Sequence, residues 1–86
     1  MNLNETIEMM KSADYQERFK AEYFQVKIRM FGLAKMLEKY KAGTLDFTPS
    51  CSYDLLHKQF EIMVEYASVL RERAQIEGIA LESESE

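Results

Sequence analysis

Apolar side chains recur at alternating intervals of three and four residues along two long stretches of this chain. The first series is Phe19, Tyr23, Val26, Met30, Leu33, Leu37 and Tyr40, and the second is Leu56, Phe60, Met63, Ala67, Leu70 and Ala74. Such spacing places each series along one side of an α-helix. Two helices that carry such seams bury them against each other, so the sequence predicts an all-α protein built on a long antiparallel helical hairpin.

Residues that favour helix ends set the predicted boundaries. Asn4 and Ser12 are expected N-caps, whereas Gly43 and Gly78 are expected to end the two long helices. The prediction is a single helical domain over residues 1–81, with a short helix at 4–11, long helices at 13–42 and 52–77, and an acidic disordered tail at 82–86. The short helix is marginal alone, and we expect it to dock through Ile7 and Met10.

Each long helix carries a second apolar stripe that its partner helix cannot reach. Phe24, Ile28 and Phe31 point away from the first seam, and the second helix adds Leu55, Ile62, Tyr66, Val69 and Ile76. Hydrophobic residues make up 47% of the chain, which is more than a lone hairpin can cover. We therefore predict a homo-oligomeric helical bundle.

Charge and cysteine content exclude several classes of protein. The formal net charge of −4 argues against a partner such as long nucleic acid, although much of the acidity lies in the terminal glutamates. Cys51 is the single cysteine, so no disulfide framework indicates secretion. No stretch is apolar enough to be a signal peptide or membrane span. These features predict a cytoplasmic protein with no membrane partner.

Catalytic and metal-binding patterns are missing from the sequence. His57 is the only histidine, with no carboxylate or cysteine partner that the sequence assigns, so we interpret it as a solvated surface residue. One cysteine and one histidine cannot supply a structural zinc site, and there is no glycine-rich phosphate loop. We predict that the protein is not an enzyme, that no residue is catalytic or a metal ligand, and that it needs no cofactor.

Aromatic and basic side chains alternate along the predicted helices. The candidate ligand-binding residues are Tyr15, Lys27, Arg29, Tyr66 and Arg73. Aromatic faces can stack on nucleobases, and cationic side chains can meet phosphates. The alternative is that the aromatic side chains belong to the core and the cations pair with acids one helical turn away, as Arg73 could with Glu77.

Three segments of the chain resemble a family of short phage and prophage helical-hairpin proteins, a family that includes the anti-CBASS cyclic-nucleotide sponge. The second long helix carries the family's Met-x-x-Tyr-x-x-x-Leu-x-x-Arg pattern at Met63, Tyr66, Leu70 and Arg73. The other two matching segments are residues 11–23 and the loop at 42–49. The loop is longer than the sponge's.

This resemblance implies a hexamer that sequesters the cyclic nucleotide messengers of bacterial defence systems. It also implies roles for individual residues. Tyr15 resembles the tyrosine that stacks on the ligand, Lys27 or Arg29 resembles a phosphate-contacting lysine, and Arg73 resembles an arginine of a second pocket. The spacing leaves the choice between Lys27 and Arg29 open.

The resulting hypothesis is a phage-encoded sponge in the cytoplasm of an infected bacterium. It would bind a cyclic oligonucleotide or an ADP-ribose-type signal and leave that signal uncleaved. Two other hypotheses compete with it. The unpaired apolar stripes could bind a host protein helix, or the chain could be a structural phage oligomer.

Overall fold

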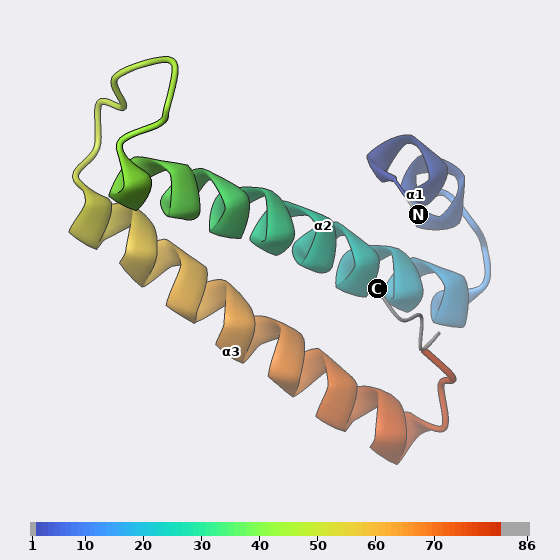
Figure 1. Cartoon of the computed structure of the whole chain (residues 1–86). Helices are drawn as coiled ribbons and strands as arrows, with labels where there is room; N and C mark the ends of the chain where they lie inside the picture. The colour runs from blue at the N-terminus through green and yellow to red at the C-terminus, as the bar shows by residue number, and fades with distance from the viewer. Residues whose placement is uncertain (1, 82–86) are drawn as a thin grey trace.

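Residues 2–81 are described by the computed structural model, and they form three α-helices with no strand among them. The helices are α1 (Leu3–Met10), α2 (Tyr15–Ala42) and α3 (Tyr53–Glu77). The two long helices lie side by side, and α1 packs against the first half of α2 (Figure 1). The predicted all-α class is confirmed, whereas the predicted tail at 82–86 lies outside the described residues.

Contacts at both ends of the long helices define their relative direction. Tyr15 at the start of α2 contacts Glu77 at the end of α3. Tyr40 near the end of α2 packs edge-on against Tyr53 at the start of α3, with ring centroids 5.5 Å apart. The two helices therefore run in opposite directions along a molecule 43 Å long. This arrangement brings residues from the two ends of the sequence together at one end of the molecule.

Both long helices end at the glycines that the sequence predicts. Gly43 has φ +75° and Gly78 has φ +72°, a left-handed conformation that carries a steric cost for residues with a Cβ. After each glycine the backbone turns back on the helix: Thr44 N–H donates to the carbonyl of Lys39, and Ile79 N–H donates to that of Ala74. The second turn folds Ile79 onto the core.

The N-cap of α1 is Asn2, and the prediction of Asn4 is wrong. The Asn2 side chain accepts a hydrogen bond from the backbone N–H of Glu5, whose carboxylate accepts one from the N–H of Asn2. This reciprocal pair is a capping box. It satisfies two backbone donors at once, which a cap at Asn4 could not do, because Ile7 would then stand at the N3 position where the acid is needed.

The N-cap of α2 is Asp14, and the prediction of Ser12 is also wrong. The Asp14 carboxylate accepts from the backbone N–H of Gln16, and α2 begins at Tyr15. Ser12 belongs to the connection instead, where its hydroxyl accepts from Asp14 N–H and its carbonyl accepts from the Arg18 guanidinium. Ser12 and Asp14, two residues apart, are both residue types that cap helices, and the backbone turn around Ser12 leaves Asp14 as the cap.

The core lies toward the end of the hairpin opposite the loop, because α1 and residues 79–81 add cover there. Its buried residues come from α2, α3 and the segment after α3, and they are Phe19, Tyr23, Phe24, Val26, Ala67, Leu70, Ala74 and Ile79. Met9 of α1 and Leu81 pack against this cluster. Toward the loop the seam residues Met30, Leu33, Phe60 and Met63 are only half-buried.

The packing of α1 changes the predicted second stripe on α2. Phe24 is buried in the core, so the expectation that nothing in the same chain reaches it is wrong, whereas Phe31 remains exposed. Thr6 and Met9 face α2, and Gln25 donates a hydrogen bond to the hydroxyl of Thr6.

The docking prediction for α1 is wrong for Ile7, which is exposed, but Met10 does reach α2: its sulfur accepts a hydrogen bond from the Gln25 amide, although the residue is half exposed. A two-turn helix can present either of two neighbouring faces, and the buried Thr6 satisfies its hydroxyl within the fold.

Candidate ligand-binding site

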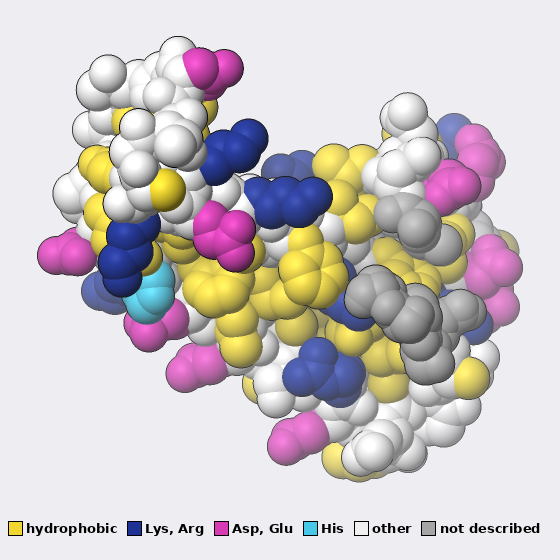
Figure 2. All heavy atoms as spheres, viewed as in Figure 1, with side chains coloured by type: hydrophobic (Ala, Val, Ile, Leu, Met, Phe, Trp, Pro, Cys, Tyr) yellow, Lys and Arg dark blue, Asp and Glu magenta, His cyan; other side chains and the backbone are white. Residues whose placement is uncertain are grey.

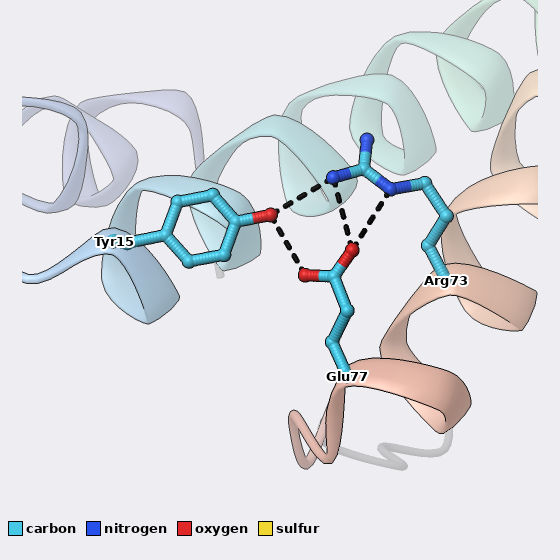
Figure 3. Close-up of polar contacts among 3 residues, drawn as sticks. All are labelled: Tyr15, Arg73 and Glu77. Carbon is cyan, nitrogen blue, oxygen red and sulfur yellow. Dashed lines mark hydrogen bonds and ion pairs between the residues drawn. The ribbon is translucent and has the colours of Figure 1, made fainter.

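Tyr15, Arg73 and Glu77 form a closed triangle of polar contacts at the end of the hairpin where the core lies (Figure 3). The Tyr15 hydroxyl donates to Glu77 Oε1 over 2.7 Å and accepts from Arg73 Nη2 over 2.8 Å. Arg73 Nε also donates to Glu77 Oε2 over 3.2 Å, and Nη2 lies 3.1 Å from that oxygen. The guanidinium thus binds a carboxylate with two nitrogens and a phenol with one of them.

Local sequence and antiparallel packing together position this triangle. Tyr15 is the first residue of α2, while Arg73 and Glu77 are one turn apart at the end of α3. The Arg73 guanidinium carbon lies 4.9 Å from the centre of the buried Phe19 ring, within cation–π distance. Phe19 therefore supports the guanidinium on the side that faces the core.

The charges of the triangle follow from these contacts. The hydrogen bond from Tyr15, followed by that from Arg73, lowers the pKa of Glu77 despite partial desolvation. The hydrogen bond to Glu77 raises the pKa of Tyr15 and also that of Arg73. At neutral pH the triangle holds an anionic carboxylate, a cationic guanidinium and a neutral phenol, all reachable by solvent.

A second tyrosine–glutamate pair lies beside the triangle. The Tyr66 hydroxyl of α3 donates to Glu22 Oε2 of α2, so each long helix supplies one tyrosine and one acid. That hydrogen bond raises the pKa of Tyr66, and the positive charge of Arg73 opposes the effect. The negative charge of Glu22 in turn contributes to the raised pKa of Arg73. Arg73 therefore lies near two acidic groups, Glu77 and Glu22, and both act on its charge.

Lys27 is not part of this cluster. It lies about 120° around α2 from Tyr15 by helical geometry, and its ammonium sits 5.5 Å from the ring centre of Tyr23 and 5.7 Å from that of Phe31. These cation–π contacts place Lys27 between the first apolar series, which includes Tyr23, and the second stripe, which includes Phe31.

Arg29 is exposed and shares a stripe of α2 with Tyr15 and Glu22, because the three residues follow one another at intervals of seven. It lies about 21 Å along the helix from Tyr15. One small ligand held at Arg73 in this chain therefore cannot also reach Arg29. The structure brings together Tyr15, Tyr66 and Arg73 of the five predicted site residues and separates Lys27 and Arg29 from them.

Glu22 and Glu77 were not among the predicted site residues. For Glu77 the signal was present, since it follows Arg73 by one helical turn and the alternative interpretation already pairs them. For Glu22 the only signal was its spacing of seven residues from Tyr15. This spacing indicates a shared site only when the position of α3 beside α2 is known.

Exposed apolar side chains border the polar cluster along α3. Leu55, Ile62, Val69 and Ile76 recur every seven residues and are 57%, 55%, 51% and 84% exposed. Figure 2 shows hydrophobic side chains along the face viewed there, interspersed with basic and acidic groups. These four residues of the predicted second stripe of α3 are thus largely uncovered within residues 2–81, whereas its fifth member, Tyr66, hydrogen-bonds to Glu22 of α2.

The remaining reactive side chains lie toward the loop. His57 stacks on Tyr53 at 5.7 Å between ring centres, and its side chain is 43% exposed, as expected for a surface residue. It also lies 3.8 Å from an oxygen of Glu61, a neighbour that the sequence did not assign. Cys51 is exposed. Within residues 2–81 no three His, Cys, Asp or Glu side chains group closely enough to hold a metal ion, and no helix there is long and apolar enough to cross a membrane.

Comparison with known protein families identifies the family to which this helical chain belongs. The family model Sequestin matches residues 13–76, which include the candidate cluster except Glu77. The chain belongs to the Sequestin family. The family name points to sequestration, the broad function class that the sequence predicts. No curated protein and no solved structure matches the chain significantly.

Proposed function

We propose that this protein is a phage-encoded sponge that binds a nucleotide second messenger of bacterial defence and does not cleave it. The messenger would be a cyclic oligonucleotide, as in CBASS signalling, or a related ADP-ribose-type molecule. The observation that carries the proposal is the convergence of Tyr15 and Arg73, 58 residues apart in sequence, on one accessible patch. Membership of a family named for sequestration supports it.

The chemistry of the patch suits nucleotide binding. A guanidinium donates to phosphate in the same forked geometry that it uses for a carboxylate. The Tyr15 ring, 46% exposed at residue level, and the partly exposed Tyr66 offer faces for stacking on bases. Leu55, Ile62, Val69 and Ile76 would pack against further copies of the chain in the proposed hexamer, so that ligand sites lie near or between protomers.

Calorimetry with a panel of cyclic di- and trinucleotides and ADP-ribose tests the proposal. We expect at least one to bind the wild type and Tyr15→Ala to weaken it about five- to hundredfold, the effect of losing a base–aromatic stack. Tyr53→Ala, which removes an aromatic ring near the loop, is the matched control and should leave affinity unchanged. The absence of heat with every nucleotide would contradict the proposal.

The sponge also differs from an enzyme in the fate of its ligand. We expect nucleotide recovered after denaturation of the loaded protein to be intact by mass spectrometry, because the hydrogen bonds to Glu77 and Glu22 raise the pKa of the Tyr15 and Tyr66 phenols, so neither phenol is an activated nucleophile. A hydrolysed product would indicate catalysis instead.

A second candidate function is binding of a protein helix, and the exposed seven-residue repeat on α3 favours it. Near the loop this stripe borders an open hollow of about 430 Å³ whose lining includes Leu55, Ile62 and Met63. In that case no nucleotide would raise the melting temperature, and Ile62→Glu rather than Tyr15→Ala would abolish binding to a partner.

A further inference from the structure

The Glu77 carboxylate is bound in the way that an anionic ligand group would be. One oxygen accepts from the Tyr15 hydroxyl, and the other receives the Nε and Nη2 edge of Arg73 (Figure 3). Arginine presents the same edge to carboxylates and phosphates. Both candidate ligand-binding groups are therefore already engaged with an oxyanion that belongs to the protein itself.

The position of Glu77 makes this engagement easy to reverse. Glu77 is the last residue of α3, where the helix dipole disfavours a negative charge. Its side chain is 31% exposed and that of Arg73 is 46% exposed, so water screens their attraction. Gly78 follows immediately and adds no side chain next to the carboxylate.

The remaining contacts of Arg73 do not depend on Glu77. The guanidinium packs on Phe19 and donates to the Tyr15 hydroxyl. Both contacts persist if the carboxylate moves away, because they come from α2. Arg73 would thus stay oriented with its Nε and Nη2 edge free. The Tyr15 hydroxyl, no longer bonded to Glu77, could donate its proton to another acceptor.

We infer that the carboxylate of Glu77 occupies the place of a phosphate group of the ligand, so that a phosphate binds Arg73 and Tyr15 only by displacing it. This inference rests on the proposed nucleotide-binding function and adds Glu77 to the residues that set its affinity. Glu77 then acts as an internal competitor that keeps the site assembled while it is empty and excludes weaker anions.

Removing the charge of Glu77 tests the inference. Calorimetry is done on the wild type, Glu77→Gln, Glu77→Ala and Glu72→Gln, with 3′,3′-cyclic GMP–AMP, cyclic di-AMP, ADP-ribose and inorganic pyrophosphate as probes. Glu72→Gln is the matched control, because it makes the same change in net charge on the same helix. Circular dichroism and light scattering check that every variant keeps the helical content and assembly of the wild type.

We expect both Glu77 variants to bind the nucleotide about two- to fivefold more tightly than the wild type, the range set by an accessible ion pair. Glu72→Gln should differ from the wild type by less than about twofold, since its charge acts only at a distance. Equal tightening by pyrophosphate would show that a free phosphate suffices.

Two results would overturn the inference in different ways. If the wild type binds a nucleotide and the Glu77 variants bind it no more tightly than Glu72→Gln does, the inference fails and the proposed function stands. If neither the wild type nor a Glu77 variant binds any nucleotide, the proposed function fails and the inference fails with it.

Discussion

At the scale of single residues, Arg73 combines contacts that a simple positive charge could not make. Its guanidinium lies over the Phe19 ring, pairs through Nε and Nη2 with Glu77, and donates to Tyr15. Each contact uses a different property of the group: its face, its forked edge or an individual N–H. A lysine ammonium has neither a face nor a fork. The identity of this residue therefore matters beyond its charge.

The first prediction follows from that difference. Arg73→Lys keeps the charge but should weaken nucleotide binding about tenfold or more, because the forked contact and the stacking on Phe19 are both lost. Isothermal titration calorimetry measures the change. Arg71→Lys, an exposed neighbour on α3, is the control. An Arg73→Lys variant with the affinity of the wild type would show that only charge is needed.

The second prediction concerns the pH dependence of stability. The contacts of Glu77 hold its folded-state pKa below the usual value of 4.5. Stability from this group is therefore fully present above about pH 4.5 and is lost as pH falls through the lower, folded-state pKa.

We therefore expect wild type to melt a few degrees at most above Glu77→Gln at pH 6. In circular dichroism melts the difference between the two melting temperatures should shrink as pH falls below about 4.5 and vanish once pH is below the folded-state pKa of Glu77. A difference that stays constant from pH 6 to pH 3 would mean that the Glu77 charge contributes nothing to folding.

At the scale of elements, local capping interactions determine where the two long helices begin and end. Gly43 has positive φ, and Asp14 and Ser52 cap the long helices through hydrogen bonds to backbone N–H groups. These interactions involve only neighbouring residues, so they form as soon as the helix does. They fix where each long helix begins and ends, and thereby which residues the antiparallel packing brings together.

The third prediction compares two glycines in and after α2. Gly43→Ala should lower the free energy of unfolding by about 1 kcal/mol, because its left-handed backbone is strained for alanine. Gly32→Ala should raise it by up to about 1 kcal/mol, since Gly32 is inside a helix and an added Cβ meets nothing within 4 Å. Urea denaturation followed by circular dichroism measures both. A stabilising Gly43→Ala or a destabilising Gly32→Ala would contradict the assigned conformations.

At the scale of the whole molecule, the distribution of apolar surface is uneven. The core is closed at the end covered by α1 and residues 79–81, while α3 exposes Leu55, Ile62, Val69 and Ile76 along its length. Ile7 and Met10 of α1 are also exposed. We expect further copies of the chain to cover it, because a repeat of seven residues suits a neighbouring helix.

The fourth prediction tests that assembly. Val69→Glu should dissociate the proposed oligomer, since it places a charge at the middle of the exposed repeat, where burial without a partner is costly. Multi-angle light scattering should then report a mass near the 10.1 kDa of the chain, while helical content stays the same. Gln75→Glu adds the same charge at an exposed polar position of α3 and should leave the oligomer intact. A monomeric wild type would refute the prediction.

Much of the local structure follows from the sequence alone. The two apolar series fix helix type and approximate length, and Gly43 and Gly78 fix the ends of α2 and α3, because periodicity and glycine conformation depend only on nearby residues. The same spacing correctly leaves Val69 and Ile76 exposed. Family resemblance over most of the chain adds the broad expectation of sequestration, which no spacing of residues could supply.

Other features required the tertiary structure. Phe24 is buried because α1 docks with Thr6 and Met9, a choice of face that two turns of helix do not determine. Glu77 joins the candidate site only because antiparallel packing places it beside Tyr15, 62 residues away. Sequence periodicity reports which residues share a side of one helix, whereas contacts between helices depend on their relative rotation and register, and these are set by the packing of the whole chain.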